Sequence, residues 1–181
     1  MGIDYDASTD MWSFACMIFE LITGDFLFNP RPGDNHKKND DHLALFMEML
    51  GPMPKKFAQQ GSMYEHYFMK NNKTGKEYFR RIHDLRPVNL EDLLIYRYQF
   101  KPNEAKMFSD FLMTILKWYP SDRPTAREML EHPWLTMPED YNYKMSEIEF
   151  KIYELRDQAT QIDNFNPDVS YIMDYKANLM N

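Results

Sequence analysis

The chain has 181 residues and carries 28 acidic against 21 basic residues, a net charge of -7. This length allows one domain, or one domain with a tail, and the 44% hydrophobic content excludes wholesale disorder. The acidic balance argues against a dedicated nucleic-acid-binding protein. The single cysteine, Cys16, excludes an internal disulfide framework and fits a reducing compartment.

The sequence predicts neither a membrane anchor nor a bound metal or cofactor. Its longest strongly apolar stretch, residues 11–22, falls short of the roughly 20 residues that span a bilayer. The histidines and the cysteine lack zinc-ligand spacing, and the glycines form no phosphate-binding loop. Residues 1–10 contain no basic residue, so no secretory signal is predicted. We therefore expect no membrane partner and no cofactor bound by this chain.

The first predicted helix covers residues 9–23, with Thr9 as its cap and Gly24 at its end. Apolar residues surround this helix on nearly every side, which is typical of a helix in the middle of a domain. Too little sequence precedes the helix to cover it. We therefore expect another segment or another chain to lie against it.

The second predicted helix follows a loop rich in proline and asparagine, starts at Asp40 or Asp41 as its cap and runs to about Leu50. Gly51 and a proline then end it. Its apolar spacing predicts a buried stripe formed by Leu43, Phe46, Met47 and Leu50. Glu48 is expected on an exposed flank.

Residues 52–88 are predicted to be irregular, because prolines, glycines and an Asn-Asn-Lys-Thr-Gly turn at 71–75 interrupt them. Five basic residues lie close together in sequence in this region. A solvated loop is the preferred interpretation over a nucleic-acid patch, since no aromatic stacking platforms alternate with the charges. The basic run consists of Lys70, Lys73, Lys76, Arg80 and Arg81.

Two further helices are predicted at about 90–98, capped by Asn89, and at about 103–118. A proline-rich turn follows at 120–124. Thr125 and Glu128 then have the spacing of a capping box, in which each side chain accepts a backbone N–H of the other residue. The helix that follows this capping box is expected to end before a proline at position 133.

The composition changes after position 137. Residues 138–181 hold nine acidic and four basic residues, and an amphipathic helix is predicted at about 146–162. The sequence therefore divides into a domain, 1–136, and a tail, 137–181. The apolar seam of the tail helix could pack back on the domain or bind a partner helix, and packing back is the favoured alternative.

Two motifs carry a family resemblance. The string Asp-Met-Trp-Ser at 10–13 opens the apolar helix, and Asp-Arg-Pro-Thr at 122–125 precedes His-Pro-Trp at 132–134. Their order and spacing resemble the C-terminal lobe of eukaryotic protein kinases. The resemblance implies a mainly α fold, the lower half of that helical lobe. It also implies structural clamps at Asp10, which would hold the catalytic loop, and Arg123, which would pair with a glutamate ending the activation segment.

A narrower resemblance rests on Gly-Asp-Phe-Leu-Phe at 24–28, Asp-Asp-His-Leu-Ala-Leu at 40–45 and Glu-Met-Leu-Gly at 48–51. These strings are similar to the SR-protein kinases, which transfer the γ-phosphate of ATP, with magnesium, to serines of Arg/Ser-rich splicing factors in the nucleus and cytoplasm. The resemblance covers about 2–136. It implies a docking groove for Arg-rich segments, with its residues at Asp25, Asp41, Glu48 and Arg97.

The sequence departs from that family in one respect. The glycine-rich loop, the phosphate-pairing lysine, the His-Arg-Asp loop and Asp-Phe-Gly do not occur in the 181 residues. We therefore expect a kinase fragment, without N-lobe, catalytic loop or activation segment, that is inactive alone. A non-catalytic module that binds Arg-rich proteins is the alternative, and a fragment that complements a separate N-lobe is a third. Asp10 and Arg123 should then lack partners, which predicts a marginal domain.

Overall fold

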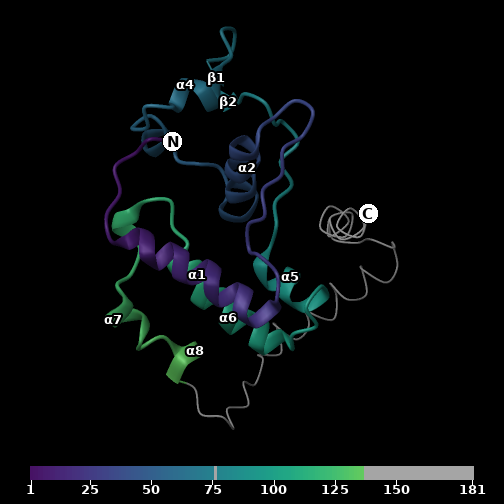
Figure 1. Cartoon of the computed structure of the whole chain (residues 1–181), viewed down its shortest axis with the longest axis vertical. Coiled ribbons are helices and arrows are strands. Elements are labelled where there is room, and N and C mark those ends of the chain that lie inside the picture. Colours follow the sequence, from purple (N-terminus) through teal and green to yellow (C-terminus); the bar gives the residue numbers. More distant parts are fainter. Residues whose placement is uncertain (76, 137–181) are drawn as a thin grey trace. The chain divides into compact units, whose positions relative to one another are not determined.

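The computed structural model describes residues 1–75 and 77–136, which are mainly helical (Figure 1). They fall into two compact units. The first contains residues 1–87 and 111–132, and the second contains 88–110 and 133–136. The predicted tail helix at 146–162 lies outside the described residues.

Helix α1, Ser8–Thr23, confirms the first predicted helix. Gly24 ends it in the left-handed conformation, φ 77°, and donates its N–H to Glu20 O at 2.8 Å. Thr9 is not the cap, because Asp6 Oδ1 accepts the Ser8 N–H at 2.9 Å instead. Within α1 only Ala15 and Phe19 are buried, so the expectation that another segment or another chain lies against this helix stays a prediction.

The outer side of α1 is therefore apolar and open in this structure. Leu21 is 72% exposed, and Met17 and Ile22 are about half exposed. The opposite side packs within the first unit, where the Trp12 ring lies 4.9 Å from Phe46 of helix α2. The described residues thus cover one side of a helix whose composition suits coverage on both.

Helix α2, Lys38–Leu50, begins two residues before the predicted start and ends at Gly51 as predicted. The Lys37 N–H is accepted by Asp40 Oδ2 at 2.9 Å, so Asp40 stabilises the first turn from inside the helix. In the stripe, Leu43 and Met47 are buried, and Phe46 and Leu50 are half-buried.

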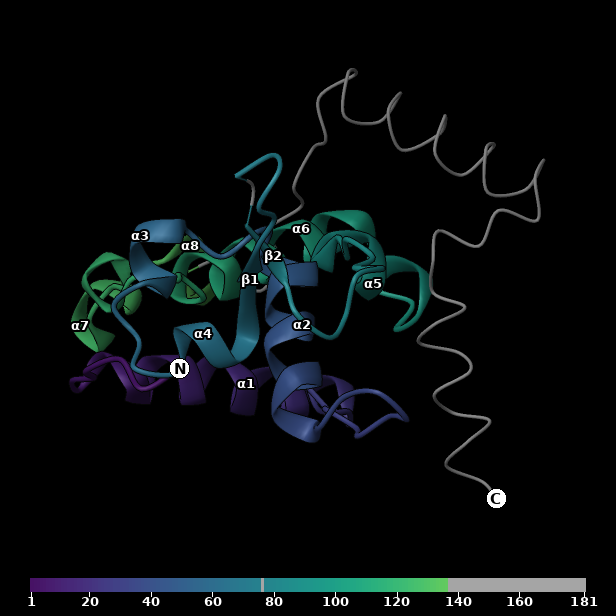
Figure 2. The same cartoon turned by 90° about the horizontal axis from the view of Figure 1, so that it is seen from above.

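The segment after α2 was predicted to be irregular, but it contains short helices and strands. These are α3 (Lys55–Ala58), α4 (Tyr64–Tyr67), β1 (Phe68–Lys70) and β2 (Glu77–Phe79). The strands form an antiparallel hairpin with Phe68 opposite Phe79 and Lys70 opposite Glu77. Its turn is the one noted in the sequence, and the hairpin lies beside α2 (Figures 1 and 2).

The core of the first unit joins α2, the short elements and the hairpin. Its buried members are Leu43, Ala44, Met47, Met53, Phe57, Ala58, Tyr67 and Phe79. Met1 and Ile3 pack against them, because the N-terminal residues run beside residues 61–63. The Met63 N–H donates to Met1 O at 3.0 Å, and a Cβ at Gly61 would meet that carbonyl at 2.5 Å.

The second unit contains α5, Leu90–Tyr96. It also contains the first part of α6, a helix that covers Pro102–Ile115 in full. Asn89 caps α5 as predicted, accepting the Asp92 N–H at 3.2 Å. Phe108 is buried between the rings of Phe100, 6.0 Å away, and Trp134, 5.0 Å away. Trp134 belongs to α8, Pro133–Thr136.

The last elements of the first unit follow the end of α6. A single 3₁₀ turn covers Pro120–Asp122, and α7 covers Ala126–Met129. The predicted capping box is confirmed: Glu128 Oε2 accepts the Thr125 N–H at 2.7 Å, and Thr125 Oγ1 accepts the Glu128 N–H at 3.3 Å.

We predict that Phe111→Ala lowers the free energy of unfolding of the first unit by about 3–5 kcal/mol. Phe111 is fully buried, with Phe14 and His132 rings at 6.4 and 5.2 Å, so the substitution leaves a cavity. Urea denaturation of the 181-residue chain measures the change. Phe26→Ala, at a ring that is 59% exposed, is the control and should shift stability by less than about 0.5 kcal/mol.

Candidate functional site

Helix α2 carries three buried carboxylates, Asp40, Asp41 and Glu48, which are 1%, 6% and 8% exposed. A buried carboxylate is costly unless hydrogen bonds or a cation compensate it. Each of the three accepts a bond from a different segment of the first unit. The helix therefore organises its surroundings through charge as well as through its apolar stripe.

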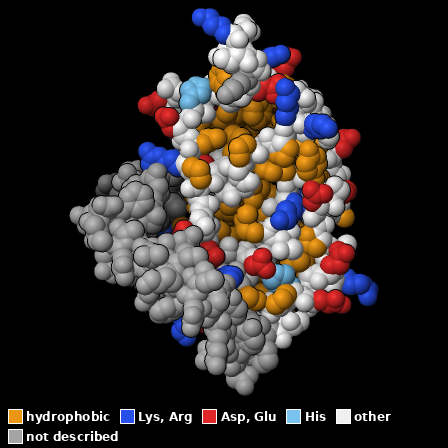
Figure 3. Space-filling view, turned by 180° about the vertical axis from the view of Figure 1, so that it is seen from behind, with side chains coloured by type: hydrophobic (Ala, Val, Ile, Leu, Met, Phe, Trp, Pro, Cys, Tyr) orange, Lys and Arg blue, Asp and Glu red, His pale blue; other side chains and the backbone are white. Residues whose placement is uncertain are grey.

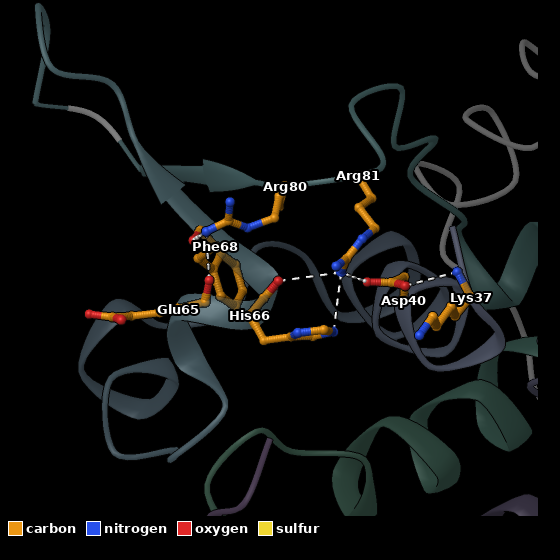
Figure 4. A network of polar contacts seen from close by, with 7 residues as sticks. All are labelled: Lys37, Asp40, Glu65, His66, Phe68, Arg80 and Arg81. Carbon is orange, nitrogen blue, oxygen red and sulfur yellow. Dashed lines mark hydrogen bonds and ion pairs between the residues drawn. The ribbon is translucent and has the colours of Figure 1, made fainter. Parts of the chain in front are cut away.

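Asp40 forms an ion pair with Arg81, whose Nη1 lies 2.7 Å from Asp40 Oδ1 (Figure 4). The same nitrogen donates to His66 O at 3.3 Å and lies 3.3 Å from His66 Nε2. Burial raises the pKa of Asp40, but the hydrogen bond from Lys37 and the Arg81 guanidinium outweigh it, so its pKa lies below the ordinary value. Arg81 thereby ties the segment after β2 to the first turn of α2.

Arg80 turns the other way, toward α4 and β1 (Figure 4). Its Nη2 donates to Glu65 O at 2.7 Å and to Phe68 O at 3.4 Å. Arg80 and Arg81 are therefore structural links and not part of a solvated loop, which corrects the prediction for this end of the basic run. The sequence signal that could have separated them from the lysines is their position beside a short strand with a buried phenylalanine.

Asp41 faces the loop that precedes α2. Its Oδ2 accepts the Arg31 backbone N–H at 2.6 Å, and its Oδ1 lies 3.9 Å from His36 Nε2. The loop closes on itself where the Gly33 N–H donates to His36 O at 3.0 Å. Asp41 thus holds this loop against the helix. It is not the helix cap, because α2 begins at Lys38.

Glu48 lies two helical turns beyond Asp41, on the same face of α2. Its Oε1 accepts the Arg86 backbone N–H at 3.1 Å. The prediction that Glu48 is exposed is wrong, because the segment after the hairpin crosses this face and covers it. The covering residues follow Glu48 by 38 positions, which no local pattern reveals.

Two other predicted docking residues have different positions. Asp25 follows the end of α1 in the first unit, is half-buried, and donates its N–H to Thr23 Oγ1 at 3.3 Å. Arg97 belongs to the second unit, where it ends α5 and places its guanidinium carbon 5.2 Å from the centre of the Tyr98 ring. The structure therefore brings Asp41 and Glu48 together on one helix and describes Arg97 in a separate unit.

Arg123 lies at the junction of α1 with the 3₁₀ turn. Its Nε donates to Lys117 O at 3.0 Å, its Nη1 donates to Ser8 O at 3.4 Å, and its guanidinium carbon lies 5.0 Å above the Trp12 ring. Burial lowers the pKa of Arg123, and the nearby Asp6 opposes that effect. Arg123 thus contacts two backbone carbonyls and the Trp12 ring within the chain, whereas its predicted pairing with a glutamate stays a prediction.

Asp10, the second predicted clamp, is exposed in the first turn of α1. The cost of an unpaired buried charge therefore does not apply to it, which corrects the physical basis of the predicted instability. An exposed carboxylate in the first helical turn instead interacts favourably with the helix dipole.

The described residues do not fit the magnesium of an ATP complex. Within 1–75 and 77–136, no group of three or more His, Cys, Asp or Glu side chains is placed to hold a metal ion. The three α2 carboxylates are each engaged with a different part of the chain. In the same described ranges, no helix is long and apolar enough to cross a membrane.

A family comparison identifies the class of protein. Residues 2–135 match the protein kinase domain model. The matched region contains the α2 carboxylates, Arg123 and the described helices of both units except the last residue of α8. The chain therefore belongs to the protein kinase family, and it covers part of a kinase domain.

Individual relatives narrow the family. Over 135 residues the chain is 45% identical to serine/threonine-protein kinase SRPK of Physarum polycephalum, 42% identical to serine/threonine-protein kinase SKY1 of Saccharomyces cerevisiae and 38% identical to SRSF protein kinase 3 of Homo sapiens. Each match covers 75% of this chain but only 31%, 18% and 23% of these relatives. The chain is homologous to the SRPK serine/threonine kinases and spans less than a third of their length.

We predict that Arg81→Ala destabilises the first unit by about 2–4 kcal/mol, because it leaves Asp40 buried without its cation while Arg81 itself is partly exposed to water. Urea denaturation at neutral pH measures the loss. Arg127→Ala, at an exposed arginine of α7, is the matched control and should change stability by less than about 0.5 kcal/mol. Equal effects of the two substitutions would contradict the role given to the Asp40–Arg81 pair.

The same pair predicts a pH dependence. Because the folded-state pKa of Asp40 is lowered, its contribution is fully present above the unfolded value, about 3.9, and is lost as the pH falls through the folded-state pKa. Asp40→Asn should remove this part of the acid sensitivity. Denaturation curves of both proteins between pH 3 and 7 test it: the difference in stability should shrink toward pH 3, and a constant difference would contradict the prediction.

We predict that Arg123→Lys lowers the free energy of unfolding by about 1 kcal/mol, since an ammonium cannot reproduce the planar contact with Trp12 together with both carbonyl bonds. Thermal denaturation compares it with Arg127→Lys, which should leave the melting temperature unchanged. A melting temperature for Arg123→Lys equal to that of the control would show that the guanidinium geometry is unimportant.

Proposed function

We propose that this chain is the C-terminal-lobe part of an SRPK-type serine/threonine kinase and that α2 supplies its docking surface for Arg-rich protein segments. The homology to the SRPK kinases over residues that include α2 supports the assignment. The relative named SRSF protein kinase 3 points to SR splicing factors as the substrate class. The single observation that carries the docking role is the pair of fixed carboxylates, Asp41 and Glu48.

The spacing of that pair suits a row of arginines. Seven residues separate Asp41 from Glu48, which places them about 10 Å apart along one helix face at 1.5 Å per residue. A backbone N–H donates to each carboxylate, from Arg31 to Asp41 and from Arg86 to Glu48. A carboxylate has about four acceptor sites, so one carboxylate can accept from a backbone N–H and a guanidinium together. Because both are already oriented, an incoming arginine loses less entropy in forming its bonds.

In this proposal the chemistry belongs to the complete kinase. ATP and magnesium supply the transferable phosphoryl group and its charge neutralisation there. The role of this chain is to hold and orient the substrate, with Asp25 contributing from the first unit. Arg97, in the second unit, stays a separate predicted docking residue. The alternative, a non-catalytic module for Arg-rich proteins, makes the same use of Asp41 and Glu48 and differs only in the absence of phosphate transfer.

We predict that a peptide of eight Arg-Ser repeats binds the 181-residue chain and that Asp41→Asn with Glu48→Gln weakens binding at least tenfold. Each amide oxygen can still accept the loop N–H, so the loops stay in place while the charge is lost. Isothermal titration at low and high salt measures the effect, and the loss should be largest at low salt.

The control is Glu131→Gln, which neutralises an exposed glutamate of the first unit. A lysine-serine peptide of equal charge tests whether the planar guanidinium matters, since it cannot make bidentate pairs. If the double variant binds as tightly as the control variant, the α2 carboxylates are not the docking site. With Mg-ATP the 181-residue chain alone should form no phosphoserine, because the proposal assigns phosphate transfer to the complete kinase.

A further inference from the structure

The first unit contains a cavity of about 730 Å³ that the proposed docking surface does not use. It lies between the α2–α3 connection, α3, α4 and the hairpin, and its apolar walls include Met47, Met53, Phe68, Tyr78, Ile82 and Leu85. Its volume is in the range of small-molecule sites, which are mostly apolar with a few polar groups. Figure 3 shows hydrophobic side chains gathered below the hairpin, with charged side chains around them.

The polar residues that line this cavity include His83 and the pair Lys55 and Glu77, whose Nζ and Oε1 atoms are 2.8 Å apart. Lys55 and the Tyr64 hydroxyl both donate to Glu77 and lower its pKa. Gln59 Nε2 adds a longer contact to the same oxygen at 3.5 Å. The Glu77 charge is thus compensated, whereas the Lys55 ammonium has three donors and is 59% exposed.

A second lysine lies at the same edge. Lys70 of β1 pairs with Glu77 across the hairpin, and its Cε would lie 4.0 Å from a Cβ placed on Gly75, which lines the cavity. Lys70 does not itself line the cavity, but its charge and that of Lys55 both lower the pKa of Glu77. This arrangement complements a ligand with an apolar body and a single negative charge.

We propose that the cavity binds an amphipathic carboxylate, with its apolar chain or ring against Met47 and Phe68 and its carboxylate at Lys55 and Lys70. Methionine and aromatic walls adapt to either shape of apolar body. Decanoate represents a chain and 2-naphthoate represents a ring. The proposal is independent of the Asp41 and Glu48 surface, so either can fail without the other.

The test uses the 181-residue chain labelled with ¹³C at its methionine methyl groups. On adding decanoate or 2-naphthoate, the Met47 and Met53 methyl signals should shift and saturate, while Met129, buried elsewhere in the first unit, should stay. Decyltrimethylammonium, with the same chain and opposite charge, should bind at least tenfold more weakly. Signals that never saturate, shifts that include Met129, or equal binding of the cation would overturn the proposal.

The matched variants are Lys55→Gln and Lys56→Gln, which remove neighbouring lysines of α3, of which only Lys55 lines the cavity. Lys55→Gln should weaken binding of the carboxylates about tenfold, as expected for losing one charge-assisted hydrogen bond. Lys56→Gln should change it less than about twofold. Ile82→Trp, which fills the cavity, should abolish binding even if Lys55→Gln disturbs the fold, and binding retained in Ile82→Trp would overturn the assignment.

Discussion

The structure of the first unit depends on the burial of three carboxylates along one helix. Asp40, Asp41 and Glu48 of α2 are nearly inaccessible to water, and each would be strongly destabilising without a donor. The donors come from three separate segments: the Arg81 guanidinium after the hairpin, the Arg31 amide before the helix and the Arg86 amide beyond it. Helix α2 therefore fixes the segments around it.

This constraint also explains why α2 is the strongest candidate for recognition of arginine. A carboxylate held in a poorly hydrated position interacts more strongly with an incoming guanidinium than one that is fully solvated. The backbone amides that donate to Asp41 and Glu48 belong to the segments that these carboxylates hold, at Arg31 and Arg86. The structural role and the proposed docking role therefore use oxygen atoms of the same two carboxylates. A substitution that removes the whole side chain would disturb both roles. Asp41→Asn and Glu48→Gln keep an oxygen for the loop N–H and remove only the charge.

Local features of the fold could be predicted from the sequence, because their physical causes lie within a few residues. Gly24, Asn89 and the Thr125–Glu128 pair end or begin helices as their chemistry dictates. The burial of Glu48 could not be predicted, because its cover comes from Arg86, 38 positions away. The Asp40–Arg81 pair spans 41 positions and was hidden for the same reason.

Two further differences have other physical causes. The hairpin escaped prediction because three-residue strands show almost no alternation, so only its turn was visible. For α1, the described residues cover one side and leave Leu21 exposed, so the predicted cover by another segment or another chain stays a prediction. For the candidate site, the family resemblance pointed to Asp41 and Glu48. The structure shows the backbone amides that hold them, which neither composition nor residue spacing could predict.

The most direct measurement is a ¹⁵N spectrum of the 181-residue chain during titration with the Arg-Ser peptide. The account predicts that the backbone amide signals of Arg31 and Arg86 shift in step with binding, because their acceptors, Asp41 and Glu48, then share charge with peptide guanidinium groups. If the peptide binds while both signals stay unchanged, the α2 carboxylates are structural anchors and the docking surface lies elsewhere.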